Sequence, residues 1–402
     1  MNAISNGPIY EIRLTPIEPI LFRDHRTARA GQDHDLKAQE PSPHTIFGAI
    51  GANIAAQYGV PIDEDEYTWM PLSSVLGGFC NVIDQGSKKR AELLGYMYCD
   101  IENQPWYPWP RHIQFINRYG TIRVGELPRF RECKNDLVSC TERNMEFLLE
   151  NNLHENEEEP TGYISEAVLA DILMWSFKEN QLLMPENAQK GINYLPTDQL
   201  HQPEMRAGLR MQYSSNTAET EMLFTRPYRR FFSGVTNEYR WGSAGFLAFY
   251  RTIGEIKGKL KAPVAFLGGD RGRAIISYKK ITPASPLQTL KAKIKKAAAG
   301  SRGFFAYLLT PAVREERWPE VDGHKPVAAA IGREQVFSGW NINRSGQHPR
   351  EIRHLIPAGS VFFYAWNTDE KKELLIESKW LEPLSDSFRN SGFGRILLGV
   401  WK

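Results

Sequence analysis

Arginines that adjoin aromatic residues are the feature of this sequence with the clearest chemical meaning. They occur as Phe22-Arg23, as the run Tyr228-Arg229-Arg230-Phe231, and as Phe393-Gly394-Arg395. A guanidinium forms planar, charge-assisted hydrogen bonds with phosphate oxygens, and an aromatic ring can stack on an unpaired base. Each cluster alone is also compatible with an ordinary exposed arginine. Together the three clusters predict contact with a single-stranded nucleic acid.

Two glycines near the end of the chain, Gly392 and Gly394, precede the apolar run at 396–401. Glycine adopts positive φ angles and allows another backbone to come close. The pattern leaves two interpretations open: a tight turn into a last core strand, or a loop whose backbone N–H groups hold phosphates. The predicted nucleic-acid-binding residues are Arg23, Arg26, Arg29, Arg226, Arg229, Arg230, Arg271, Arg273, Gly392, Gly394 and Arg395.

Residues for catalysis or metal binding form a weaker pattern. His25, His34 and His44 lie near Asp24, Asp33 and Asp35, which is conceivable for a general base or a metal ligand. Their spacing is not helical, and solvated loop histidines explain the pattern better. No P-loop, G-x-S-x-G or H-E-x-x-H motif occurs, and the four cysteines contain no C-x-x-C pair. The residues alone therefore show no recognisable catalytic motif, and we expect no metal or cofactor site.

Composition sets broad limits on the molecule. The 402 residues are 42% hydrophobic and 24% charged, which is typical of globular proteins with a substantial core. A net charge of only +2 excludes a uniformly basic surface, but not a basic groove balanced by the acidic run at 155–159. No signal peptide and no membrane-spanning run is recognised in the sequence. These features predict a soluble, cytoplasmic protein.

The order of the expected elements predicts an α+β fold with antiparallel sheets. Strands are expected at 9–21, 221–232, 244–253, 265–276, 302–311, 361–366 and 396–401, and helices at 43–54, 165–177, 287–299 and 370–376. Two split β-α-β units of the ferredoxin type fit this order best. We place the first at 1–282 and the second, which carries the glycine-rich loop, at 283–402.

The region at about 63–200 is irregular by comparison and is interpreted as an insertion of surface elements in the first unit. It contains the Pro/Trp segment at 104–110 and the acidic run. Long excursions of this kind are usually functional. Aromatic residues are enriched at interfaces, so the Pro/Trp segment is interpreted as an exposed contact with other proteins.

Several stretches of the chain resemble one known family. They are LTPIEPILFRDHRTARAG at 14–31, PSPHTIFGAIGA at 41–52, LLTPAV at 308–313, FSGWN at 337–341, IPAGSVFFYAW at 356–366 and GFGRILLGVW at 392–401. They are similar to the repeat-associated RAMP proteins of the Cmr (type III-B) CRISPR effector complex. Among these, they most resemble the subunit that binds the 5′ handle of the guide RNA.

The resemblance implies two ferredoxin-like (RRM-like) folds, a glycine-rich loop and no nuclease activity. It also implies three partners: the 5′ handle of the crRNA, the large polymerase-like (cyclase) subunit, and the backbone RAMP subunits. Arg23 and Arg26 match the arginine-bearing loop of the family, and Gly392 and Gly394 match its glycine-rich loop. His25 stands where the family has a small residue. Two alternatives remain: a guide-processing endoribonuclease that uses a loop histidine, and a scaffold that contacts only protein.

Overall fold

The fold is taken from a computed structural model of the chain. It describes residues 7–22, 39–60, 75–76, 91–113, 115–118, 121–124, 127–132, 147–150, 162–178, 193–212, 214–215, 217–231, 244–256, 263–281, 286–313, 318–338, 340–343, 346–349, 351–367, 371–385 and 387–402. In this part of the chain no helix has the length and apolar content needed to cross a membrane.

The largest sheet of the described residues has eight strands in the order β13-β14-β1-β12-β2-β3-β8-β9, and we call it the first sheet. Its strands are antiparallel, with bounds β1 Ile9–Pro16, β2 Glu92–Cys99, β3 Pro105–Pro108, β8 Tyr163–Ser165, β9 Tyr194–Leu195, β12 Gly245–Arg251, β13 Val264–Leu267 and β14 Gly272–Lys280. The alternating burial of β1 follows its sequence pattern. The strand ends at Pro16, as expected of a residue that cannot donate to the ladder.

Helix α1, Pro43–Gln57, packs on this sheet and begins where the sequence predicts. The Ser42 hydroxyl accepts a hydrogen bond from the Thr45 N–H, and Pro43 occupies the first turn, where no backbone donor is needed. Ile46, Ile50 and Ile54 recur every four residues and are fully buried, so one face of the helix closes the core.

The interpretation of 63–200 as surface insertions is wrong for much of the region. Strands β2, β3, β8 and β9 lie in the first sheet, with β2 next to β12. The Pro/Trp segment forms β3 and its continuation, and Trp106, Tyr107 and Trp109 are at most 5% exposed. This segment is therefore core rather than an exposed protein contact. The acidic run lies outside the described residues.

Helix α4, Glu166–Leu173, confirms the helix predicted at 165–177 and its cap: the Ser165 side chain accepts from the Val168 N–H. The helix ends early, and Trp175 takes a left-handed conformation with φ 57°. Short helix α5 spans Thr197–Leu200. Two-stranded pairs also join β4 Phe115–Arg118 with β5 Thr121–Val124, and β6 Arg129–Glu132 with β7 Phe147–Glu150.

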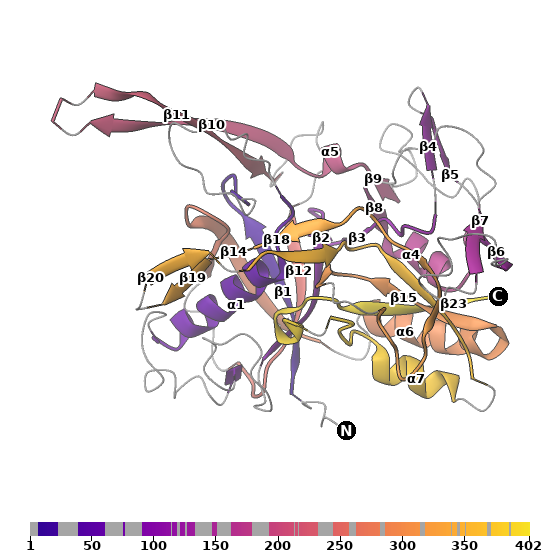
Figure 1. Ribbon diagram of the computed structural model, residues 1–402. Helices are drawn as coiled ribbons and strands as arrows, with labels where there is room; N and C mark the ends of the chain where they lie inside the picture. Colours follow the sequence, from indigo (N-terminus) through magenta and orange to yellow (C-terminus); the bar gives the residue numbers. More distant parts are fainter. Residues whose placement is uncertain are drawn as a thin grey trace.

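The second sheet, counted over the described residues, has four antiparallel strands in the order β17-β22-β15-β23. They are β15 Gly303–Leu308, β17 Pro326–Ala330, β22 Val361–Ala365 and β23 Ile396–Trp401. Helix α6, Pro286–Ala297, with its 3₁₀ extension at Ala298–Gly300, lies beside helix α7, Lys372–Lys379 (Figure 1). Lys291 and Lys295 of α6 both bind Glu377 of α7. The other strands after residue 300 are β16 Ala312–Val313, β18 Gln335–Phe337, β19 Trp340–Asn343, β20 Gly346–Pro349 and β21 Arg353–Ile356.

Both sheets contain the same interleaved strand order. In the first, β12 lies between β1 and β2 in the run β14-β1-β12-β2, and α1 connects β1 with β2. In the second, β22 lies between β15 and β17 in the run β23-β15-β22-β17. The chain passes from one sheet to the other between Lys280 and Pro286. The structure is thus a mixed α/β fold with antiparallel sheets.

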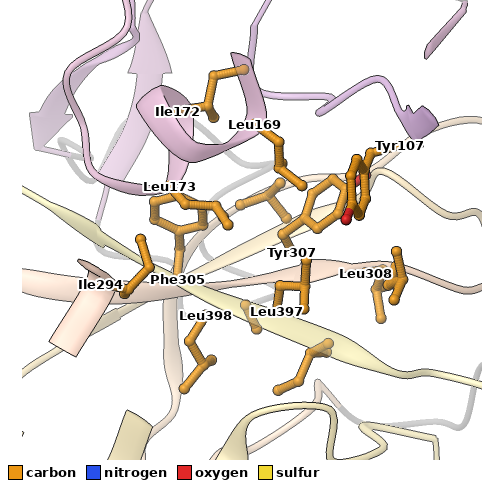
Figure 2. Close-up of a cluster of buried hydrophobic side chains, with 14 of the residues drawn as sticks. Tyr107, Leu169, Ile172, Leu173, Ile294, Phe305, Tyr307, Leu308, Leu397 and Leu398 are labelled. Atoms are coloured by element: carbon orange, nitrogen blue, oxygen red, sulfur yellow. The ribbon is translucent and has the colours of Figure 1, made fainter. Parts of the chain in front are cut away.

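One buried core spans both sheets. Tyr107 of β3, Leu169 and Leu173 of α4, and Phe305 and Tyr307 of β15 belong to the same cluster (Figure 2). The Tyr307 hydroxyl also donates to the Pro108 carbonyl at 2.6 Å. The two sheets therefore share their interior.

Candidate nucleic-acid interface

A long hairpin projects from the body of the molecule (Figure 1). It pairs β10, Gln202–Gln212, with β11, Thr217–Arg230, so the predicted strand at 221–232 is confirmed and begins earlier. At the root, Ile20 and Arg229 exchange backbone hydrogen bonds of 2.9 and 2.8 Å. The register sets Arg206 opposite Arg226. Directly opposite residues point to one face, so the even-numbered side chains of this hairpin root share a face.

Glu204 links two arginines on this face. Arg206 Nε and Arg230 Nε each donate to a Glu204 carboxylate oxygen at 2.7 Å. The Arg206 guanidinium also lies 4.5 Å from the centre of the Tyr228 ring, a cation–π contact. Desolvation alone would raise the pKa of Glu204, but the hydrogen bonds from Arg206 and Arg230 outweigh it and lower that pKa. The carboxylate is therefore ionised and holds both guanidinium groups in place.

The turn between β13 and β14 adds a second carboxylate. Asp270 Oδ2 accepts hydrogen bonds from Arg226 Nη1 and from the Tyr228 hydroxyl, each at 2.6 Å. The sequence predicts that Gly268 and Gly269 supply the positive φ angles of this turn. Gly268 does so at 73°, but the next left-handed residues are Asp270 and Arg271, at 55° and 53°. This conformation presents Asp270 to the hairpin, and the Arg271 side chain is exposed.

Arg273 and Glu18 form the third pair. Glu18 accepts from the Arg273 backbone N–H at 2.8 Å and from its Nε and Nη2 at 3.1 Å each. These hydrogen bonds lower the pKa of Glu18, and the charge of Arg206 acts in the same direction, so the pair adjoins the hairpin root. Two exposed apolar side chains lie nearby: Ile17, which directly follows β1, is 46% exposed, and Phe266 of β13 is 58% exposed.

We call this set of side chains the arginine surface; it consists of Arg206, Arg226, Tyr228, Arg230, Arg271 and Arg273 with Glu18, Glu204 and Asp270. Five arginines against three carboxylates leave two positive charges. Four of the predicted residues, Arg226, Arg230, Arg271 and Arg273, are brought together here. Arg206 and the three carboxylates were not among the predicted site residues. The alternation R-x-Y-x-R at 226–230 was the available signal, because it places these side chains on one face of a strand.

Arg229 belongs to the interior instead. The residue is 5% exposed, and its side chain forms an ion pair with Glu40 at 2.7 Å and donates to the Tyr98 hydroxyl at 3.0 Å. Burial by itself would lower the pKa of this guanidinium, but the negative charge of Glu40 outweighs burial and raises it. Arg229 was predicted to contact RNA; in the structure its side chain is directed instead to Glu40 and Tyr98. The residue joins the hairpin root to the residues before α1.

Arg23, Arg26 and Arg29 lie outside the described residues, as do His25 and His34. The residues that flank this segment are described. Gln39 N–H donates to the Phe22 carbonyl at 3.2 Å, and Leu21 pairs with Gly269 in an isolated bridge. The flanking residues therefore lie beside the β13–β14 turn of the arginine surface.

The glycine-rich loop near the C-terminus is packed inside the protein. Gly392 and Gly394 have φ angles of 95° and 69°. A Cβ on Gly392 would lie 2.7 Å from Leu93 Cδ2, and one on Gly394 would lie 2.5 Å from the Ser385 nitrogen. The Gly394 N–H donates to the Pro311 carbonyl at 2.8 Å. Of the two interpretations of these glycines, the tight turn into a core strand describes them, and the loop does not present its N–H groups to a ligand.

Arg395 is likewise a structural residue. It is 2% exposed, and its Nη1 and Nη2 donate to the Leu381 and Arg389 carbonyls at 3.0 and 2.8 Å. Burial lowers its pKa to about 10. Gly392, Gly394 and Arg395 were predicted to contact phosphate; in the structure all three make internal contacts instead. Phe393 and Arg395 lie close together in the sequence because both are part of the buried core.

Comparison with known proteins settles the family. The model of the family described as CRISPR-associated protein (Cas_Cmr3) matches residues 12–401. The chain belongs to the CRISPR-associated Cmr3 family. The resemblance found in the sequence is thereby confirmed, while no curated protein matches the chain.

Solved structures show more distant similarity to this Cmr3 family member. A chain from the cryo-EM structure of the type III-B Cmr-beta bound to cognate target RNA is 13% identical, with a TM-score of 0.43, and the match covers 88% of this chain and 86% of that chain. The same values hold for that complex with AMPPnP, state 1. A chain of the Csm3–Csm4 subcomplex of the type III-A interference complex is 9% identical, with a TM-score of 0.38 and coverage of 98% and 99%.

Proposed function

We propose that this protein is the non-catalytic subunit of a type III-B CRISPR effector complex that binds the 5′ handle of the crRNA. Membership of the Cmr3 family supports a role in such a complex. The observation that carries RNA binding is the arginine surface, where Arg206, Arg226 and Arg230 share one face of a projecting hairpin with Tyr228. The large polymerase-like subunit and the backbone RAMP subunits are the proposed protein partners.

Binding by this surface follows from its chemistry. The guanidinium groups hold phosphates of a single strand, and the Tyr228 ring provides a face for one base. The phosphate contacts supply affinity that falls as salt rises, while base contacts determine which handle is preferred. We further propose that both sheets are ferredoxin-like units, because each contains the interleaved strand order in which a third strand separates the two strands of a β-α-β connection.

A pair of matched variants tests the proposal. Arg206 and Arg353 are both 46% exposed, and each pairs at 2.7 Å with a glutamate two residues earlier, Glu204 and Glu351. Arg206→Ala should weaken binding of a handle-bearing single-stranded RNA about fivefold, since an exposed charge contact contributes roughly 1 kcal/mol. It should also reduce the slope of log K against log salt by about 0.7, the value for one lost phosphate contact.

Arg353→Ala is the control and should bind like the unmodified chain. Fluorescence anisotropy at two salt concentrations provides the measurement, with the RNA checked for integrity in the presence of a chelator. Equal effects of the two variants would overturn the assignment of the surface. Cleaved RNA would favour a processing nuclease, and failure of the unmodified chain to bind would favour a scaffold that contacts only protein.

A further inference from the structure

We propose that the Asp270 carboxylate occupies a phosphate-binding subsite formed by Arg226, Tyr228 and Arg271, and that a backbone phosphate of bound RNA displaces it. This inference rests on the proposed function, because it names how one phosphate enters the arginine surface. Asp270 thereby becomes a residue that determines which ligands can bind, and not only a partner that neutralises Arg226.

The contacts of Asp270 are those that a phosphodiester would make. One oxygen accepts from a guanidinium and from a phenol hydroxyl, each at 2.6 Å. A phosphodiester, like a carboxylate, carries one negative charge on two terminal oxygens, so it can accept the same two donors without altering the net charge of the subsite. Arg271 is the next residue in the turn and is exposed, so we include its guanidinium in the proposed subsite as a second positive charge.

Asp270 is the carboxylate of this surface that is best placed to leave. Its side chain is 36% exposed, so it can be solvated as soon as it moves. It sits in a turn bordered by Gly268, Gly269 and Gly272, in a left-handed conformation that Asp and Asn tolerate better than most residues. Glu18 is fixed more firmly, because the backbone N–H of Arg273 holds it in addition to the guanidinium.

A subsite that Asp270 must vacate discriminates between RNA ligands more strongly than an empty positive surface would. A phosphate arriving alone must compete with a carboxylate that is tethered at high local concentration. An RNA already held elsewhere on the protein presents its phosphate at a comparable local concentration and can compete. The internal carboxylate therefore discriminates against weakly held, non-cognate RNA, a form of selection through a competing contact.

The experiment compares Asp270→Asn with Glu351→Gln in the full-length chain, using the handle-bearing RNA. Glu351 also pairs with an exposed arginine, Arg353, so its variant removes one negative charge from an equivalent pair. Asp270→Asn should tighten binding about fivefold, and Glu351→Gln should change it less than about twofold. Thermal melting of each variant shows whether the fold is retained.

A double-mutant cycle separates exchange from a general charge effect. In an Arg226→Ala background, Asp270→Asn should change affinity by less than about twofold, because the subsite is gone. An equal gain in both backgrounds, or weaker binding by Asp270→Asn alone, would overturn the inference while leaving RNA binding intact. Tyr228→Phe, which keeps the net charge, should weaken RNA binding by the Asp270→Asn protein. Unchanged RNA binding would also overturn the inference. An unmodified chain without RNA affinity would instead refute the proposed function.

Discussion

His112 is a titratable residue placed in the shared core. It is 2% exposed, and neither ring nitrogen has a hydrogen-bond partner within the described part of the chain. Its ring is stacked at 6.1 Å on Trp175 and contacts Phe305 and Phe363 of the second sheet. Burial lowers the pKa of His112 to about 3, so the ring is neutral wherever the protein is folded under ordinary conditions.

This burial predicts acid sensitivity. An unfolded histidine has a pKa of about 6.5, so between roughly pH 6.5 and pH 3 the unfolded chain binds one more proton than the folded chain at this site. Stability therefore falls as pH falls, by up to about 1.4 kcal/mol per pH unit from this residue. His112→Phe should flatten the change in urea midpoint between pH 7 and pH 5. An unchanged difference between the two pH values would show that His112 is not the responsible group.

Strand parity explains which arginines the sequence could place. Arg226, Tyr228 and Arg230 are two residues apart, so a confirmed strand brings them to one face. Arg229 has the opposite parity, and its partner Glu40 lies 189 positions earlier. Local spacing carries no information about a partner at that distance. Glu18 and Asp270 could not be predicted for the same reason. Glu204 is the exception, because it lies two residues from its partner Arg206.

Elements with local signals are the part of the fold that the sequence predicts well. Ser42 and Ser165 cap their helices through their own side chains, and each cap depends on residues within three positions. The glycine-rich loop shows the limit of this reasoning. Its two glycines are needed because the side chain of Leu93, far away in the sequence, and the backbone of Ser385, outside the turn itself, fill the space where a Cβ would lie.

Substitution of a loop glycine is therefore expected to lower the stability of the fold rather than to remove a ligand contact directly. Gly394→Ala adds a Cβ at a left-handed φ and against the Ser385 backbone nitrogen, so it should destabilise the fold by about 2 kcal/mol. Gly300→Ala is the control: no atom lies within 4 Å of its added Cβ, so the change should stay within about 0.5 kcal/mol. Urea unfolding measures both. Equal midpoints for the two variants would contradict the packing described for the loop.

At the scale of the whole molecule, the sequence indicates the class of fold but not which strands share a sheet. Strands β3, β8 and β9 contain four, three and two residues, too few for a period to be recognised. Their antiparallel partners are set by contacts across long stretches of chain, such as Trp106 with Ser165. The segment at 104–110 was misread because its aromatic residues suit an interface as well as a core.

The shared core predicts that the two sheets fold as one unit. Phe305, Phe363 and Tyr307 of the second sheet pack on His112 and Pro108 of the first part of the chain. Residues 283–402 alone would expose these rings to water, at a cost of roughly 1.5–3 kcal/mol for each large apolar side chain. We expect the intact chain to unfold in a single calorimetric transition and the isolated segment to lack a cooperative one.

The Tyr307 hydroxyl gives a finer measure of the same coupling. Tyr307→Phe removes its hydrogen bond to the Pro108 carbonyl and should lower stability by about 1 kcal/mol without splitting the transition, because the ring still fills the core. Two separate transitions in the intact chain, or an isolated segment that melts cooperatively at the temperature of the whole, would show that the halves are independent domains. In that case the boundary between 282 and 283 would separate two folding units, and the shared cluster would be an interface formed after each had folded.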